Sequence, residues 1–267
     1  MSGVLQAIVA AKEVEVRALL GTRRAQAAHA PRGHVKTSLR RGAGEPLRLI
    51  AENKRRSPSA GALSTTLSTP DRVARYAESG AAMVSVLCDA GFFGGSWDDV
   101  VAARGALAAM GSAIPVLAKE FVLHPRQLEE AAACGADAVL LIARILDRES
   151  LAELHLAALG LGLEPLVEVV TDEELESALG AGAELIGVNA RDLDTLVMDP
   201  VRAARVLEAI PAGCIPVYLS GLKGPADVQR LAATRAHAAL VGETLMREED
   251  PRAQLAAMVQ AAGSAQT

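Results

Sequence analysis

The sequence has few aromatic residues and no excess of positive charge. Six of its 267 residues are aromatic, and 27 basic residues stand against 32 acidic ones, which gives a formal net charge of −5. Such a chain lacks the positive field that neutralises phosphates and the rings on which bases stack, so we expect no nucleic-acid partner. It also lacks any apolar run of the roughly 18–20 residues that cross a bilayer, so we expect no membrane span.

Cysteine and histidine are scarce as well, and their spacing excludes several kinds of site. The three cysteines include no CxxC pair and the five histidines no HExxH motif, so we expect no metal site. Cysteines without such spacing favour a reducing compartment. The N-terminus lacks a basic segment, and Lys12 and Glu13 interrupt its short apolar stretch, which argues against a signal peptide. These features predict a cytoplasmic globular protein.

Lysine is rare among the basic residues, with five lysines against 22 arginines. The position of each lysine therefore matters. An ammonium group with a pKa near ~10.4 can be tuned downward to release a proton, whereas a guanidinium with a pKa above ~12 cannot. The lysines are Lys12, Lys36, Lys54, Lys119 and Lys223.

Eight short apolar segments recur along the chain and predict buried strands. Four of them begin with proline, which the first position of a strand tolerates; they are 46–54, 115–119, 165–168 and 216–220. The other four follow a small-residue turn that suits the end of a helix; they are 80–87, 135–142, 182–189 and 236–242. Near-continuous apolar runs of this kind are typical of parallel strands covered on both faces.

The segments between these strands have helical spacing. We predict helices at 70–79, 98–110, 125–134, 147–159, 172–181, 200–209, 224–235 and 245–262. Eight alternating strands and helices indicate a (β/α)₈ TIM barrel. An open doubly wound sheet is the weaker alternative, because a fourfold repeat of βαβα units closes naturally into eight strands. We expect residues 46–267 to form the barrel and residues 1–45 an N-terminal helical extension packed on it.

Polar residues follow the predicted strands at their C-terminal ends, where TIM barrels carry their chemistry. These residues are Glu52, Asn53, Lys54, Lys119, Glu120, Glu168, Asn189, Arg191 and Ser220. Any one of them could be a solvated rim residue. Lys54 and Lys119 stand out because the chain otherwise prefers arginine, which favours a role in proton transfer.

Two glycine-containing turns predict a phosphate site after the last two strands. Gly221 follows Ser220, and Gly242 precedes Glu243 at the start of a short helical segment. Glycine lets backbone N–H groups approach an anion, and loops after strands 7 and 8 are the recurrent phosphate site of these barrels. The long loop at 55–70, with Ser57 and two arginines, could close over the phosphate or be a flexible solvated loop.

Three motifs in the sequence resemble the indole-3-glycerol phosphate synthase family of tryptophan biosynthesis. They are IAENKRRSPSAG at 50–61, PVLAKEF at 115–121 and GVNARDL at 187–193. The resemblance extends over residues 5–251. It implies a carboxy-lyase that closes 1-(2-carboxyphenylamino)-1-deoxyribulose 5-phosphate to indole-3-glycerol phosphate, with loss of CO₂ and water and without a metal or organic cofactor.

The resemblance also assigns roles to the residues at the predicted barrel mouth. Lys119 would protonate the carbonyl during ring closure, Lys54 would protonate the departing hydroxyl, and Glu168 would accept the proton lost on rearomatisation. Glu52 would hold Lys119 charged, and Asn189 would bind a substrate hydroxyl. The substrate-binding residues would be Ser57, Phe93, Phe121, Leu140, Arg191, Leu193 and Ser220, with Arg191 on the anthranilate carboxylate. The phosphate would bind Ser57, Gly221, Gly242 and Glu243.

The chain departs from the family pattern at three positions. Leu219 stands where the family has glutamate, Glu120 where it has aspartate, and Asn53 where it has an aliphatic residue. Loss of one substrate hydrogen bond at position 219 would cost ~1–3 kcal/mol, so we predict a working but slower enzyme.

Two alternatives remain open at this point. One is another phosphate-binding barrel, such as a phosphoribosylanthranilate isomerase-like enzyme. The other is a barrel that binds a phosphorylated ligand without turnover, which Leu219 favours. We expect a small phosphorylated substrate and a monomer or weak homo-oligomer. Replacing Lys119 with arginine should abolish turnover, and the same change at Lys223 should leave it intact.

Overall fold

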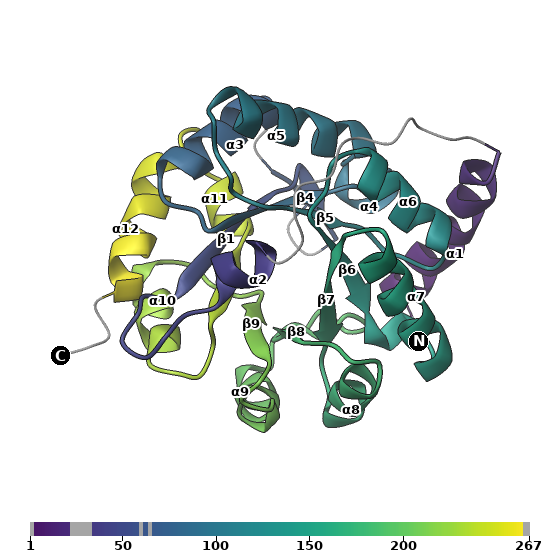
Figure 1. The fold of residues 1–267 in the computed structure, drawn as a ribbon. Helices are drawn as coiled ribbons and strands as arrows, with labels where there is room; N and C mark the ends of the chain where they lie inside the picture. Colours follow the sequence, from purple (N-terminus) through teal and green to yellow (C-terminus); the bar gives the residue numbers. More distant parts are fainter. Residues whose placement is uncertain (1–2, 22–33, 59–60, 64–65, 264–267) are drawn as a thin grey trace.

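Eight parallel strands close into a barrel with helices around it (Figure 1). The structure is a computed structural model that describes residues 3–21, 34–58, 61–63 and 66–263. The barrel strands are β1 (Arg48–Asn53), β4 (Met83–Leu87), β5 (Val116–Lys119), β6 (Ala138–Ile142), β7 (Glu164–Val169), β8 (Leu185–Asn189), β9 (Ile215–Leu219) and β10 (Ala238–Val241). The predicted (β/α)₈ barrel is thereby confirmed, and β1 closes it by pairing with both β4 and β10.

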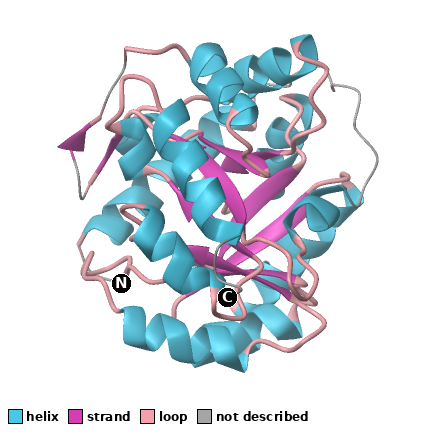
Figure 2. Ribbon diagram, turned by 90° about the vertical axis from the view of Figure 1, so that its left-hand side faces the viewer, coloured by secondary structure: helices cyan, strands magenta, loops and turns pink. Residues whose placement is uncertain are grey.

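Helices follow the strands and cover the outside of the barrel (Figure 2). The longer ones are α3 (Thr69–Glu78), α5 (Trp97–Ala109), α6 (Pro125–Ala133), α7 (Arg148–Gly160), α8 (Asp172–Gly180), α9 (Pro200–Ala209), α10 (Pro225–Ala232) and α12 (Arg252–Gly263). Short elements lie at strand ends: the pair β2 (Arg56–Ser57) and β3 (Gly61–Ala62), α4 (Ala90–Phe93), the 3₁₀ turn η1 (Ala143–Ile145) and α11 (Glu243–Met246).

One predicted helix is wrong in its extent. The segment 245–262 contains two helices, α11 and α12, instead of one. Pro251 lies between them, and proline interrupts a helix because it has no N–H to donate and clashes with the preceding turn.

Helix starts follow local capping chemistry. Thr171 and Asp199 cap α8 and α9 by accepting hydrogen bonds from backbone N–H groups of the first turn. In α3 the side chain of Ser68 is the cap, and Asp71 lies in the first turn as an acidic residue. The cap at Thr171 starts α8 three residues after β7 ends at Val169, which keeps that βα loop short.

The core has two layers, one inside the barrel and one between the sheet and the helices. Val35 and Leu39 of α2 (His34–Leu39) belong to the inner layer, together with Met83 and Ile215 from the barrel wall. In Figure 1 this short helix lies over the barrel interior. It fills the end of the barrel where the strands begin.

Helix α1 (Val4–Leu19) packs beside the other end of the barrel, against α6 and α4. Its Leu5 and Ile8 also join the inner core layer. The boundary at residue 45 between extension and barrel stays a prediction, and residues 22–33 of the extension lie outside the described residues.

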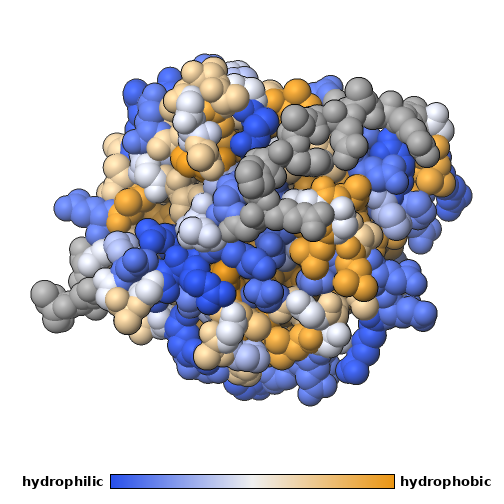
Figure 3. Space-filling view, viewed as in Figure 1, coloured by the Kyte–Doolittle hydropathy of each residue, from blue (hydrophilic) through white to orange (hydrophobic). Residues whose placement is uncertain are grey.

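The surface seen in Figure 3 is mostly polar, with apolar side chains in separate groups. Over the part of the chain that the structure describes, no helix has the length and apolar character needed to cross a membrane.

Candidate active site

A cavity of about 460 Å³ lies at the C-terminal ends of the barrel strands. All of the residues to which the resemblance assigned a role line it: Glu52, Lys54, Ser57, Phe93, Lys119, Phe121, Leu140, Glu168, Asn189, Arg191, Leu193, Ser220, Gly221, Gly242 and Glu243. Asn53, also named at the predicted mouth, does not line it and donates to Thr69 Oγ1 instead. The lining residues come from the eight barrel strands and the loops that follow them. Only closure of the barrel brings them together.

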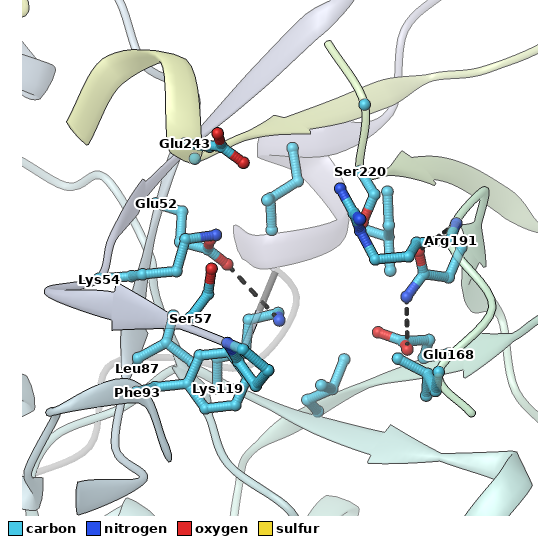
Figure 4. Close-up of a pocket in the computed structure, with 18 of the residues that line it drawn as sticks. Glu52, Lys54, Ser57, Leu87, Phe93, Lys119, Glu168, Arg191, Ser220 and Glu243 are labelled. Atoms are coloured by element: carbon cyan, nitrogen blue, oxygen red, sulfur yellow. Dashed lines mark hydrogen bonds and ion pairs between the residues drawn. The ribbon is translucent and has the colours of Figure 1, made fainter. Parts of the chain in front are cut away.

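Glu52 lies between the two lysines of the mouth. Its Oε1 is 2.5 Å from the Nζ of Lys54, and its Oε2 is 3.5 Å from the Nζ of Lys119. Figure 4 shows the two ammonium groups on either side of this carboxylate. The second distance is longer than a hydrogen bond, so Lys119 is held electrostatically and keeps donor capacity for another group.

Charge and burial act against each other at these residues. Burial alone would raise the pKa of Glu52, but Lys54 and Lys119 outweigh it and leave the pKa below its usual value. Burial would lower the pKa of Lys119, but Glu52 and Glu168 raise it above the usual value. The sequence argument allowed for tuning of a lysine pKa downward, and Lys119 shows the opposite shift. It is held protonated, as an acid must be before it donates.

Glu168 stands across the cavity from this pair, at the end of β7 (Figure 4). Burial raises the pKa of its carboxyl above the usual value, although the charge of Lys119 and a hydrogen bond from Asn189 oppose the rise. The Nδ2 of Asn189 donates that bond to Oε1 over 2.9 Å. A buried carboxylate with a raised pKa is suited to accept a proton.

The apolar part of the cavity contains two phenylalanine rings. Phe93 and Phe121 have centroids 5.9 Å apart with ring planes inclined at 35°. Leu140 from β6 and Leu193 from the loop after β8 line the same cavity. These side chains make a surface that can cover an aromatic ring and exclude water from it.

The loops after β9 and β10 form the proposed phosphate end. Ser220 has φ +72°, a strained conformation for a residue other than glycine, and Gly221 follows with φ +87°. Strain of this kind in a cavity wall is typical of a binding site. Glu243 begins α11 directly after Gly242, and Ser57 is buried in β2.

Gly242 also touches the charged pair at the centre of the site. A Cβ atom at this position would lie 2.3 Å from Oε1 of Glu52 and 3.0 Å from Nζ of Lys54. Only glycine leaves room for the ion pair, so the loop after β10 lies directly against Glu52 and Lys54.

Several residues of the cavity were missed by the sequence argument. Val4, Leu5 and Ile8 of α1 line it, although only their amphipathic spacing could be recognised. Lys223 lines it as well, so Lys223→Arg is not a suitable control for Lys119→Arg, although the sequence suggested that it would be. Leu219, which the sequence analysis singled out, is buried at the end of β9 and places an apolar group in the cavity wall.

Lys12 is another functional candidate that the sequence left unassigned. Its side chain is buried, and its Nζ lies 3.0 Å from Asp89 Oδ1 and 2.9 Å from Glu120 Oε1. Glu120 follows Lys119, and Asp89 caps α4, which carries Phe93. Burial raises the pKa of Glu120 to about 7, despite the opposing charge of Lys12. The cluster attaches α1 to the end of the barrel that contains the cavity.

The arginines of the loop after β1 are bound to protein groups. Arg55 pairs with Asp99 at 2.5 Å, and Arg56 donates to the carbonyl oxygens of Ala90 and Gly91. Neither lines the cavity, so the idea that both could close over a phosphate is not supported. Ser59 of the same motif lies outside the described residues.

The described residues contain no group of three or more histidine, cysteine, aspartate or glutamate side chains placed to hold a metal ion. The polar side chains that line the cavity instead carry mainly ammonium, carboxylate, amide and guanidinium groups. Proton transfer and anion binding are the chemistry that such a set can perform.

Comparison with known proteins adds a family match. A family model described as indole-3-glycerol phosphate synthase matches residues 5–258. The indole-3-glycerol phosphate synthase of Mycobacterium avium (strain 104) is 43% identical over 259 residues, covering 96% of this chain and 91% of that protein. The protein of the same name from Mycolicibacterium smegmatis is 42% identical, with the same coverage of both chains.

Solved structures show the same barrel at low sequence identity. The tryptophan synthase subunit alpha from Legionella pneumophila has a TM-score of 0.64 at 15% identity, covering 87% of this chain and 99% of that one. Thiamine phosphate pyrophosphorylase from Pyrococcus furiosus has a TM-score of 0.63 at 15% identity, covering 85% and 100%. At this identity the likeness concerns the fold alone.

Proposed function

The chain belongs to the indole-3-glycerol phosphate synthase family, and we propose that Lys119, Lys54 and Glu168 carry out the family's ring closure at the barrel mouth. As a member of this family it is a carbon–carbon lyase of tryptophan biosynthesis. It converts 1-(2-carboxyphenylamino)-1-deoxyribulose 5-phosphate to indole-3-glycerol phosphate, releasing CO₂ and water.

Lys119 is the general acid for ring closure. As the aryl carbon attacks the sugar carbonyl, negative charge develops on the carbonyl oxygen and must be neutralised. Glu52 and Glu168 keep the ammonium of Lys119 protonated, and the 3.5 Å separation from Glu52 leaves an N–H available for that oxygen. The attacking aryl carbon carries the carboxylate, and it then loses CO₂, which restores the aromatic ring.

Lys54 is the second acid, and Glu168 is the base. After ring closure the former carbonyl oxygen is a hydroxyl that must leave as water, and Lys54 provides the proton. Glu168 accepts the ring proton that is lost when the indole becomes aromatic. Its raised pKa supports this role, and Asn189 holds the carboxylate in place.

The rest of the cavity binds the two ends of the substrate. Arg191 lies at the end that receives the carboxyphenyl group, where a planar guanidinium can pair with the carboxylate. The phenyl ring packs on the apolar side chains of Phe93, Phe121, Leu140 and Leu193. The phosphate lies against Ser57, Ser220 and the backbone N–H groups of Gly221, Gly242 and Glu243.

We also propose that the enzyme acts in the cytoplasm as a monomer or weak homo-oligomer. Its three cysteines all lie in the described residues, are buried and form no disulfide, as expected in a reducing compartment. A phosphoribosylanthranilate isomerase-like activity is less favoured, because it does not account for two lysines that share one buried carboxylate.

The single observation that carries the proposal is Glu52 placed between two lysines and opposite a buried glutamate. An assay of the purified protein with the carboxyphenylamino sugar phosphate tests it, by following indole fluorescence against the low background of one tryptophan, Trp97. We expect a rise in fluorescence that is proportional to enzyme concentration. Saturable binding of the substrate without any such rise would instead establish the non-catalytic alternative.

A further inference from the structure

The loop that presents Arg191 to the cavity is a compact turn of its own. The backbone N–H of Asp192 donates to Val197 O over 2.9 Å, and that of Leu196 donates to Asp192 O over 2.8 Å. Arg191 and Met198 form an isolated antiparallel bridge that closes the turn. Residues 190–199 therefore keep their shape as a unit. The N–H of Ala190 donates to Leu219 O over 3.0 Å and attaches the base of the unit to β9, whereas the bonds within the turn do not attach its tip to the barrel.

Arg191 depends on this turn for the position of its side chain. Its Nη1 donates to the carbonyl oxygen of Leu196 over 3.0 Å, and its backbone N–H donates to Asn189 Oδ1. Leu196 itself has φ +60°, unusual for a residue with a branched side chain. The guanidinium that meets the substrate carboxylate is therefore aimed by the turn, and it moves if the turn moves.

Arg144 of η1 connects this turn to the neighbouring strand ends. Its Nη1 lies 2.8 Å from Asp194 Oδ2 and 3.7 Å from Asp192 Oδ2. Its Nε donates to Glu174 in the first turn of α8, and the other oxygen of Glu174 accepts the N–H of Val170 over 2.6 Å. One guanidinium thus joins the loops that follow β6, β7 and β8.

The location of Arg144 separates it from the reacting groups. It does not line the cavity, and about 80% of its side chain is covered, since 20% remains exposed. A guanidinium has a fixed planar geometry, so pairing with three carboxylates restricts both the distance and the orientation of the groups it joins. Asp192 and Asp194, its partners on the turn, lie on either side of Leu193, which lines the cavity.

We propose that Arg144 is a positioning residue that sets substrate affinity, because it fixes the 190–199 turn so that Arg191 and Leu193 meet the carboxyphenyl end of the substrate. This inference rests on the proposed function, since it takes Arg191 as the group that binds the carboxylate. Arg144 touches neither substrate nor reacting atoms, and it acts through the turn.

The test compares Arg144→Met with Arg148→Met, using the purified full-length protein. Arg148, on α7, also pairs with a glutamate of α8, but its 3.7 Å contact with Glu176 is exposed and leads to no loop of the cavity. We expect Arg144→Met to raise KM about tenfold with kcat within about twofold of wild type, the pattern of lost uniform binding. Arg148→Met should match wild type in both constants.

The product provides a second measurement, because indole-3-glycerol phosphate has lost the carboxylate. The inhibition constant of the product should therefore stay within about twofold in Arg144→Met, while KM for the carboxylated substrate rises. In a double-mutant cycle, Arg191→Met and Arg144→Met should be strongly non-additive, because both remove the same contact. Arg144→Lys, which keeps the charge but not the fork, should recover part of the loss.

Several results would overturn the inference. Equal weakening of substrate and product, or additive effects with Arg191→Met, would show that Arg144 acts on the barrel generally. If Arg144→Met does not fold, Asp194→Asn removes one arm of the connection, and an unchanged KM in that variant would refute the role. A wild-type enzyme without turnover would refute the proposed function as well, whereas an active wild type with an unaffected Arg144→Met refutes only this inference.

Discussion

The two ends of the barrel contain the same kinds of charged residues in different arrangements. At the end where the strands begin, Lys36 lies 3.2 Å from Glu184 and 3.7 Å from Glu164. At the same end Asp137 pairs with Arg104 and accepts a hydrogen bond from the backbone N–H of Val116. At the opposite end Lys119 is 3.5 Å from its carboxylate partner and faces an open cavity.

The apolar residues differ in the same way. Val35 and Leu39 of α2 fill the closed end and join the inner core. At the mouth, Phe93 and Leu193 pack against that core but also line the cavity. The comparison teaches that the closed end satisfies its charges and contributes stability, whereas the mouth keeps donors and apolar surface for a ligand.

The largest difference should come from replacing one lysine at each end with arginine. Lys119→Arg keeps the charge but removes a proton donor of suitable pKa, so we expect kcat to fall by about 10²–10⁴-fold. Lys36→Arg keeps the ion pairs with Glu164 and Glu184 and should leave kcat unchanged. Steady-state kinetics by indole fluorescence measures both.

Lys36 replaces Lys223 as the comparison because Lys223 lines the cavity. Thermal unfolding of both variants checks that each is folded. Similar kcat values for Lys119→Arg and Lys36→Arg would remove the proton-donor role from Lys119 and the functional distinction between the two ends.

Much of this distinction could be predicted from the sequence, since it rests on local signals. Gly80, Gly135 and Gly182 have φ between +83° and +88°, as expected for glycines that end helices before strands. Strand ends then locate Lys119 and Glu168 at the mouth, because all eight strands run in parallel. The placement of the candidate residues around the cavity follows from that topology.

The remaining features depend on contacts between distant residues. Arg55 pairs with Asp99, 44 positions along the chain, and so is withdrawn from the cavity. Lys12 is buried only because α1 brings it to Asp89 and Glu120. Local patterns cannot specify which partner a charged side chain finds, since that depends on how elements pack in three dimensions.

A smaller effect is expected from adding one methyl group at each end. Gly242→Ala places a Cβ against Oε1 of Glu52 and Nζ of Lys54, which must shift. We expect kcat/KM to fall roughly 10- to 100-fold, as displacements of about 1 Å in a site commonly cost. Gly213→Ala in the loop before β9 has open space and should leave kcat/KM unchanged.

The same kinetic assay compares Gly242→Ala at the mouth with Gly213→Ala at the closed end. If Gly242→Ala retained full activity, the contact between the phosphate end and the Glu52–Lys54 pair would have no functional weight. A fall in both variants would instead point to sensitivity of the whole barrel, and unfolding curves would then show a common loss of stability.

The finest comparison lies along a single strand, because β7 begins with Glu164 and ends near Glu168. Burial raises the pKa of both carboxyls. For Glu168, a raised pKa means that the unprotonated base is lost as pH falls, so kcat/KM should decline on the acidic side from a pH above the usual glutamate range. Asn189→Ala removes a hydrogen bond that favours the charged form, and the decline should move to higher pH.

Glu164 should affect stability alone. A carboxyl whose pKa is higher in the folded state than in the unfolded state adds to the free energy of unfolding. This contribution is full at pH values below the unfolded-state pKa and is lost as pH rises through the folded-state pKa. Glu164→Gln should therefore reduce the fall in unfolding free energy with rising pH, measured by urea titration, and leave the pH profile of kcat/KM in place. A profile that moves equally in Glu164→Gln and Asn189→Ala would report the charge of the whole barrel instead of the base at its mouth. If Glu164 affects only the pH dependence of stability and Glu168 only the pH profile of kcat/KM, the two ends of β7 differ in function although five residues span them.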